Sequence, residues 1–418
     1  MFISDFKSNY INLDKKFKIL LIVFFLLPLS LIVGPATLEP LLFISSLIGI
    51  YLLYKKVIKI KFNFIIYVLI LLYLVLVISS LLSNDIFFSL RSSLPLIRFF
   101  LTIIVICYLI ENNEWILKYF FFYIVILLSF VLIDASIQTL FGYNLLFLKS
   151  KSNYLITGFF GEEKVLGRYL MVLMSLTIGL YFSIFNRIIN INYFTLFIIF
   201  VNSILIFTSE RLSMLYGFII IFFYIFYLSK INSKKYLLLL LIPIFIYLSF
   251  YKYSPANFFY NKIKNTFMQI TDYNSHIHFY SKEHENFAYT SIELFKEKPI
   301  IGIGPKNFRN ECNKIKKKYI ESSNCSTHPH HNFFQILSEV GVIGCVIYLI
   351  IFLSLFKLLI KNLLSQNKKK IALIFFLLPT IFYINPILPS GNIFNNWNMM
   401  MGLITIPFYL IFNKKNEI

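Results

Sequence analysis

Long apolar runs recur along this sequence, and they constrain its fold more than any other feature. Seen through a window of about 19 residues, each run is long enough to cross a hydrocarbon core of roughly 30 Å. Hydrophobic residues make up 58% of the 418 residues and charged residues only 14%, which excludes an ordinary soluble domain. The sequence therefore predicts an all-α integral membrane protein with about twelve transmembrane helices. The runs lie near residues 17–33, 38–54, 62–82, 93–110, 119–140, 164–185, 193–208, 212–228, 236–251, 333–356, 371–388 and 397–412.

The distribution of Lys and Arg predicts the orientation of these helices. If both termini are cytoplasmic, most basic residues of the short loops fall on the cytoplasmic side, as the positive-inside rule requires. The one long polar stretch, residues 254–332, then lies outside the cytoplasm, between the ninth and tenth predicted helices. No cleavage site follows the first run, so we expect it to be a retained anchor. The chain is interpreted as one membrane domain, residues 1–418, with the loop 254–332 inserted in it.

The formal net charge of +20 has two interpretations. It reflects topology together with a Lys-, Phe-, Ile- and Asn-rich composition, or it serves contact with anionic lipids or another polyanion. Nucleic acid is excluded as a partner, because the sequence contains no soluble basic domain.

All six histidines fall between His276 and His331, inside the long polar stretch. Three of them form the block Thr327-His328-Pro329-His330-His331-Asn332, directly before the tenth predicted helix. A histidine at the water-facing mouth of a membrane helix can exchange protons near neutral pH beside a lipid-borne substrate. Zinc binding is the alternative function of the block. Because the spacing of its histidines does not match a standard zinc site, we expect neither metal nor cofactor. The others, His276, His278 and His284, are interpreted as solvated loop residues.

The polar stretch also contains a predicted helix and a glycine-rich turn. Residues 282–298 place Phe287, Ile292 and Phe295 at helical spacing, and Pro299 ends the helix. The next residues read IGIGPKNFR and include Lys306 and Arg309. Their backbone N–H groups either cradle a phosphate or belong to an ordinary turn.

Two cysteines, Cys312 and Cys325, lie in the polar stretch, whereas Cys107 and Cys345 lie in apolar runs. On the oxidising side of a membrane, the first two are able to form a disulfide, worth about 3 kcal/mol for a loop of about 15 residues. We predict this disulfide over the alternative of two free thiols.

Arginines mark the extracytoplasmic ends of several predicted helices. An arginine at such a position is costly if it faces lipid, so it should face a cavity, a carboxylate or an anionic ligand. Glu162, Glu163 and Glu210 are available carboxylates, and for any single arginine a salt bridge remains an alternative to ligand binding. A guanidinium suits a pyrophosphate through paired hydrogen bonds. The arginines are Arg91, Arg98, Arg168 and Arg211.

The histidine block and the helix after it resemble the signature of the bacterial O-antigen ligase and O-antigen polymerase superfamily. In that group, a His-Asn pair at the end of the large periplasmic loop precedes a Glu-x-Gly-x-x-Gly pattern, here Glu339 to Gly344. The doubled histidine leaves His331 as the closest match to the essential histidine of the family and keeps His330 as a second candidate. The resemblance extends to the segments IGIGPKNFR, TSERLSMLYG, GFFGEEKVLGRYL and RSSLPLIRFF.

The resemblance implies a metal-independent, inverting glycosyl transfer at the periplasmic face of the bacterial inner membrane. The donor is a glycan on undecaprenyl diphosphate. The acceptor is a lipid A core sugar for a ligase, another lipid-linked glycan for a polymerase, or a protein side chain for an oligosaccharyltransferase. His331 or His330 acts as the base. The implied diphosphate ligands are Arg211 and Arg168, then Arg98, Arg91, Arg309 and Lys306, with Asn332, Glu339 and Glu210 in support.

Two other classes stay open. A lipid-linked oligosaccharide transporter or flippase also uses intramembrane cations, but it favours inverted repeats and broken helices near the membrane midplane. A scaffolding membrane protein does not need clustered arginines and histidines.

Overall fold

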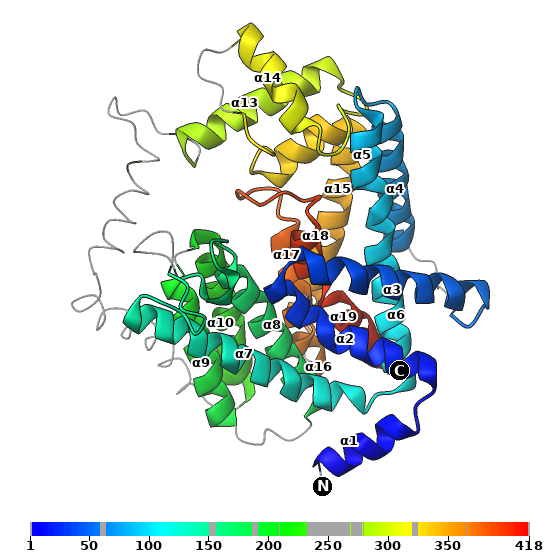
Figure 1. Ribbon diagram of the computed structural model, residues 1–418, viewed down its shortest axis with the longest axis vertical. Coiled ribbons are helices and arrows are strands. Elements are labelled where there is room, and N and C mark those ends of the chain that lie inside the picture. Colours follow the sequence, from blue (N-terminus) through cyan, green and yellow to red (C-terminus); the bar gives the residue numbers. More distant parts are fainter. Residues whose placement is uncertain are drawn as a thin grey trace.

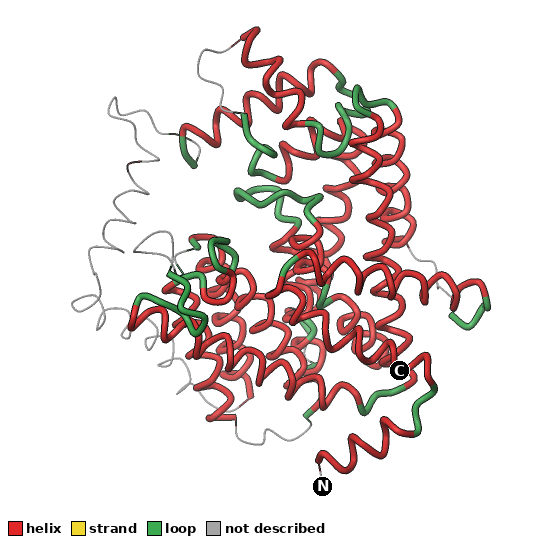
Figure 2. The backbone as a smooth tube through the Cα atoms, viewed as in Figure 1, coloured by secondary structure: helices red, strands yellow, loops and turns green. Residues whose placement is uncertain are grey.

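The computed structural model describes the chain with gaps, and within the described part the secondary structure is helical. The described residues are 2–58, 64–149, 156–185, 191–208, 210–231, 268, 278, 280–319, 325–365 and 367–416. Figure 2 shows helices joined by loops, and no strand, in these segments.

The helices follow the predicted apolar runs in order. Two short 3-10 helices, η1 (Leu94–Leu96) and η2 (Gly158–Phe160), interrupt them. The α-helices are α1 (Phe2–Ile11), α2 (Lys15–Val33), α3 (Pro35–Tyr54), α4 (Phe64–Leu81), α5 (Ile86–Ser93), α6 (Ile97–Asn112), α7 (Ile116–Phe141), α8 (Leu166–Ile184), α9 (Ile191–Phe207), α10 (Arg211–Ile231), α13 (Lys282–Glu297), α14 (Phe308–Tyr319), α15 (Asn332–Leu363), α16 (Lys368–Ala372), α17 (Ile374–Tyr383), α18 (Asn396–Leu403) and α19 (Ile406–Lys415).

Eight helical segments among the described residues are long and apolar enough to cross a membrane. The predicted count of about twelve is therefore not confirmed. The run 236–251 lies outside the described residues, and α9 is a shorter apolar helix. The runs 371–388 and 397–412 are broken into α16 with α17 and α18 with α19. Pro386, Pro389 and Gly391 disfavour helix in the polar segment between them, and Pro407 stands at the start of α19.

Helices distant in sequence pack against each other to form the core. α15 lies along α4, α3 along α6, and α8 along α17. α13 and α14 form a cap at one end of the molecule, beside the ends of α15 and α5, and both chain termini lie toward the other end (Figure 1). The cap has a small core of its own, which contains Leu294, Ile303, Phe308, Cys312 and Ile315.

The first helix of the cap begins and ends close to the predicted residues. Its N-cap is Ser281, whose hydroxyl accepts a hydrogen bond from the N–H of His284 at 3.3 Å. The apolar face differs from the prediction: Phe287 and Leu294 are buried, whereas Ile292 and Phe295 are only half-buried. The small residues Thr290 and Ser291 complete the buried face, so the helix lies close to its neighbours.

Candidate functional site

A break inside α15 joins the membrane helices to the cap. At Gly341 the backbone has φ 74° and ψ −171°, a conformation that side chains disfavour. The glycine-rich turn lies against this break: the N–H of Ile303 donates to the Ser338 carbonyl at 3.0 Å, and the N–H of Gly304 donates to the Glu339 carbonyl at 2.9 Å. A Cβ on Gly341 would meet the backbone of Ile300. These glycines serve a close backbone crossing, which favours the turn over the phosphate cradle.

The carboxylate of Glu339 lies fully buried beneath the turn. Its Oε1 accepts the N–H of Phe308, the first residue of α14, at 3.1 Å, and its Oε2 accepts from Gln335 Nε2 at 3.0 Å. Since a carboxylate at a helix N-terminus is stabilised by the helix dipole, Glu339 fixes the start of α14. Glu339 therefore supports the position of Arg309 on α14.

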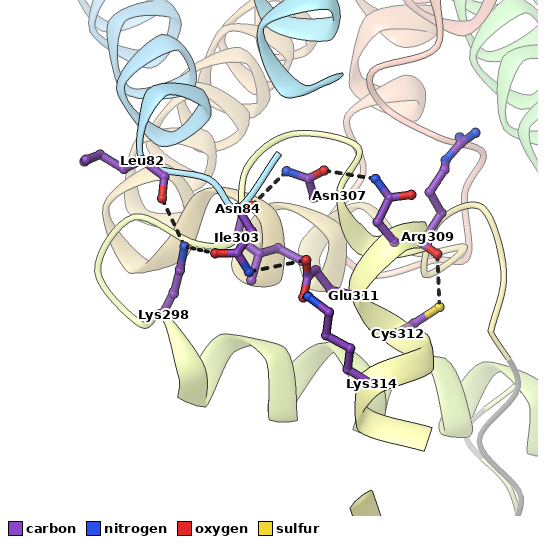
Figure 3. Close-up of polar contacts among 10 residues, drawn as sticks. Leu82, Asn84, Lys298, Ile303, Asn307, Arg309, Glu311, Cys312 and Lys314 are labelled. Carbon is purple, nitrogen blue, oxygen red and sulfur yellow. Dashed lines mark hydrogen bonds and ion pairs between the residues drawn. The ribbon is translucent and has the colours of Figure 1, made fainter. Parts of the chain in front are cut away.

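Polar contacts hold the cap on the turn after α4, as Figure 3 shows. Lys298 Nζ donates to the Leu82 carbonyl at 3.0 Å and to Asn84 Oδ1 at 2.9 Å. Asn84 Nδ2 in turn donates to Glu311 Oε1 at 3.3 Å, and Lys314 pairs with the other oxygen of Glu311 at 2.6 Å. Because these partners come from the turn after α4, the C-cap of α13 and α14, the network fixes the orientation of the cap.

A disulfide joins α14 to the histidine block. Cys312 and Cys325 are bonded, with a Cα–Cα distance of 5.6 Å, and Cys107 and Cys345 are free. Cys312 is completely buried in the cap core. The link holds the residues before His328 against the same helix that carries Arg309.

His331 is the N-cap residue of α15, and one of its ring nitrogens is already bonded. Nε2 lies 2.9 Å from the carbonyl oxygen of Ile387, which also accepts the hydroxyl of Tyr280. A carbonyl only accepts, so Nε2 carries the proton and Nδ1 has the free lone pair. Nδ1 is buried and has no hydrogen-bond partner among the described residues. Burial lowers the pKa of His331, although its hydrogen bond to Ile387 opposes the shift, so the imidazole is a neutral proton acceptor near pH 7.

Four histidines gather around this point, and we call His284, His328, His330 and His331 the histidine site. The ring centroids of His328 and His330 are 4.0 Å apart, and those of His284 and His330 are 6.2 Å apart. His330 Nε2 lies 3.0 Å from Ser326 Oγ, so its ring is less available as a base than that of His331.

The interpretation of His284 as a solvated loop residue is wrong, and His278 lies in a loop as predicted but is half-buried. His284 belongs to α13, and burial lowers its pKa. The reason is that α13 packs against α15 and turns this side chain inward. His278 Nδ1 is 2.6 Å from Glu285 Oε2, a pairing that its isolated position in the sequence did not indicate. His276 lies outside the described residues.

The segment 384–395 supplies the other wall of the site, and the sequence did not lead us to expect it. It forms an isolated antiparallel bridge between Pro389 and His331, and the N–H of Ser390 donates to the carbonyl of His330 at 2.8 Å. The hydroxyl of Ser390 donates to Asn332 Oδ1 at 2.8 Å, while Asn332 Nδ2 donates to the Tyr383 carbonyl at 2.7 Å. Asn332 therefore holds the histidine block against the C-terminal helices. The available signal was a run of Asn, Pro and Gly between two short apolar runs.

Arg168 enters the site from the first turn of α8. Its guanidinium bonds Asn398 and lies 6.0 Å from the centre of the Trp397 ring. The backbone N–H groups of Gly167 and Arg168 donate to the carboxylate of Glu210, so Glu210 caps α8 and sets the position of the arginine. A cavity of about 50 Å³ lies beside Arg168, with Ser390, Gly391 and Asn398 on its polar side and residues of α10 and α17 on its apolar side.

Three further predicted cations lie around the histidine site. Arg211, exposed at the start of α10, is close enough to His284 to lower the pKa of that imidazole. Arg309 lies near His328, whose pKa it lowers. Lys306 lies near Arg309. Burial of the Lys306 ammonium lowers its pKa, and the positive charge of Arg309 lowers it further.

Arg98 and Arg91 have other surroundings. Arg98 on α6 forms an ion pair with Glu39 on α3, and Asn396 bonds the other oxygen of Glu39. The sequence predictions named Glu162, Glu163 and Glu210 as carboxylate partners and missed Glu39, although an acidic residue inside an apolar run requires a cation. Arg91 is exposed on α5, and no hydrogen bond or ion pair joins it to the described residues of the histidine site.

Within the described residues, no three or more His, Cys, Asp and Glu side chains are arranged to hold a metal ion.

Comparison with known proteins adds one match. No curated protein matches the sequence. The family model described as O-antigen ligase matches residues 194–349, a stretch that contains Arg211, the histidine site, Asn332 and Glu339. Together with the eight candidate spans, this match identifies a multi-pass bacterial membrane protein. Over residues 194–349 the chain is therefore similar to the O-antigen ligase family.

Proposed function

We propose that the protein transfers a glycan from undecaprenyl diphosphate to an acceptor hydroxyl at the periplasmic face of the bacterial inner membrane. The acceptor hydroxyl belongs to a lipid A core sugar or to another lipid-linked glycan, and an oligosaccharyltransferase acting on protein is the alternative within the superfamily. In this orientation both termini lie in the cytoplasm and the cap lies in the periplasm. The position of both termini away from α13 and α14 supports it (Figure 1).

The state of His331 is the observation that carries the proposal. Its Nε2–H donates a hydrogen bond to the Ile387 carbonyl, while Nδ1 is buried, unprotonated and without a partner among the described residues. A base needs this arrangement, because the hydrogen bond on one nitrogen fixes the tautomer that leaves the other nitrogen free. The acceptor O–H gives its proton to Nδ1 as its oxygen attacks the anomeric carbon of the donor.

The cations around the histidine site are placed to bind the diphosphate, which is the leaving group of the proposed reaction. When the bond between the anomeric carbon and the diphosphate oxygen breaks, the electron pair stays on the diphosphate. Arg168 and Arg211 bind that group and stabilise its growing charge, with Arg309 and Lys306 beside them. Attack from the face opposite the diphosphate inverts the configuration at the anomeric carbon. The apolar wall of the cavity beside Arg168 faces the start of the polyprenyl chain.

The test is transfer by the purified protein from an undecaprenyl-diphosphate glycan to an acceptor, with products resolved by mass. We expect His331→Ala to abolish transfer and Arg211→Lys to reduce it strongly, since lysine lacks the guanidinium fork. His278→Ala is the matched control, because His278 pairs with Glu285 outside the histidine site. Full activity of both site variants would contradict the proposal. A protein that moved the donor across vesicles without forming product would instead be a transporter.

The phenotype of a deletion strain separates ligase from polymerase. Loss of all capped core indicates a ligase, and core that carries a single repeat indicates a polymerase. Complementation with the His331→Ala gene should restore neither the capped core nor the polymerised glycan, although the variant protein reaches the membrane.

A further inference from the structure

His328 is the most enclosed polar group of the histidine block that the proposed mechanism does not use. Its exposed fraction is 8%, and its Nε2 is buried without a hydrogen-bond partner among the described residues. Its Nδ1 lies 2.9 Å from the hydroxyl oxygen of Thr327. If that hydroxyl donates to Nδ1, then Nε2 carries the proton and is a donor that makes no hydrogen bond of normal geometry among the described residues, although the backbone of Ser390 interacts with the imidazole. A buried donor of this kind requires an acceptor, because leaving it unpaired is costly.

The surroundings of Nε2 indicate the charge of the missing acceptor. Arg168 on α8 and Arg309 on α14 both lie close enough to lower the pKa of His328. Burial makes the largest contribution, followed by His330, and their effect outweighs the opposing backbone hydrogen bond of Ser390, so the pKa is lowered to about 3. The imidazole is therefore uncharged near pH 7. Arg309 Nε is itself buried and unpartnered among the described residues.

The backbone separates the two histidines. His330 has φ 55°, the left-handed region that a side chain occupies at a cost of about 1–2 kcal/mol. This turn follows Pro329 and lets His331 reach Ile387, while His328 remains within electrostatic range of the two arginines. The contacts of His330 with Ser326 and Ser390 hold the turn.

We propose that His328 donates a neutral hydrogen bond from Nε2–H to a phosphate oxygen of the lipid diphosphate, held between Arg168 and Arg309. This role rests on the proposed function and adds a binding residue to it. His331 then accepts the proton of the acceptor, and His328 stays uncharged throughout. A neutral donor binds the diphosphate without adding another positive charge to the cations already around it.

The test is binding of undecaprenyl diphosphate to the purified full-length protein in detergent, by titration. His328→Leu removes the donor at similar volume and should weaken binding roughly tenfold to a hundredfold, the usual effect of losing one hydrogen bond to a charged group. The side-chain amide of His328→Gln reaches the place of Nε2 and should keep the affinity within about threefold. The shorter side-chain amide of His328→Asn reaches only the place of Nδ1, so this variant should not keep the affinity. His278→Leu serves as the control outside the site.

The outcomes separate this inference from the proposed function. If the unsubstituted protein fails to bind undecaprenyl diphosphate, both fall. If it binds and transfers, but the Leu variant binds equally well, only the role of His328 is overturned. If the Leu variant does not fold, the Gln and Asn variants decide: equal affinities overturn the role, and tighter binding by Gln supports it. The contribution of His328 should also be the same at pH 6 and pH 8, whereas a charged donor would strengthen binding at the lower pH.

Discussion

Replacing Gly341 by alanine tests how the cap is joined to α15. The substitution acts in two ways: it places a side chain at φ 74°, and its Cβ meets the backbone of Ile300. Gly34 provides a matched control, because it has φ 112° and ψ −171°, the same region of backbone conformation as Gly341, with open space where a Cβ would stand. Both variants carry a backbone cost of about 1–3 kcal/mol, and both restrict the unfolded chain to the same extent. The difference between them isolates the close crossing.

The size of that difference follows from the hydrogen bonds at the crossing. Relief of the clash separates the glycine-rich turn from α15 and breaks three bonds: Ile303 N–H to Ser338, Gly304 N–H to Glu339, and Val342 N–H to the Pro299 carbonyl at 2.8 Å. At about 1 kcal/mol each, their loss adds about 3 kcal/mol. We therefore expect Gly341→Ala to destabilise the protein by about 4–6 kcal/mol and Gly34→Ala by about 1–3 kcal/mol.

The assay is thermal unfolding of each purified variant in detergent, followed by circular dichroism, together with glycan transfer. Gly341→Ala should lower Tm at least twice as much as Gly34→Ala. It should also lose transfer, because the displaced turn carries Lys306 and leads into Arg309. Equal losses of Tm in the two variants would refute the close crossing as the reason for this glycine.

Three further predictions use the same preparations. Because the folded state holds the pKa of His328 at about 3, below its ordinary value of 6.5, the unfolded state binds more protons below pH 6.5, and stability falls as the pH falls. Between pH 7 and pH 5 this imidazole should lower the free energy of unfolding by about 2 kcal/mol. His328→Gln should remove that contribution from the pH dependence of Tm. Cys312→Ser should lower Tm and transfer, whereas Cys107→Ser should not; unchanged transfer in both would show that the disulfide is not needed by the site. Glu39→Gln should lower stability more than Glu114→Gln, whose pairing with Lys415 is exposed, and equal effects would contradict the ion pair with Arg98 as a structural contact.

Local patterns in the sequence predicted the elements that depend on local physics. The helix over residues 282–298 has its cap residue, its apolar spacing and its terminating proline within one short stretch, and α13 follows it closely. His331 likewise stands at the start of α15, since the change from polar to apolar residues marks that point. The predicted pairing of Cys312 with Cys325 needed only the exclusion of the two cysteines in apolar runs.

Contacts between distant segments could not be predicted in this way. Ile387 holds His331 through a backbone carbonyl, and a carbonyl has the same chemistry at every residue, so no side chain signals it. Glu39 was identifiable in principle, because a carboxylate in an apolar run needs a cation, but nothing local specified Arg98. The glycines of the IGIG segment were compatible with a ligand or with a backbone crossing. Only the position of α15 distinguishes the two.

The site extends beyond the stretch that matches the family model. Residues 194–349 contain His331 and Arg211, but Arg168 comes before this stretch, and Ile387 and Asn398 come after it. Since Ile387 fixes the tautomer of His331 and Asn398 binds Arg168, the proposed base and one proposed diphosphate ligand each depend on residues outside the match. A change in the segment 384–395 should therefore alter transfer as severely as a change in the histidine block. The matched stretch supplies the imidazole that we propose as the base, and Ile387, outside that stretch, determines which of its nitrogens is free.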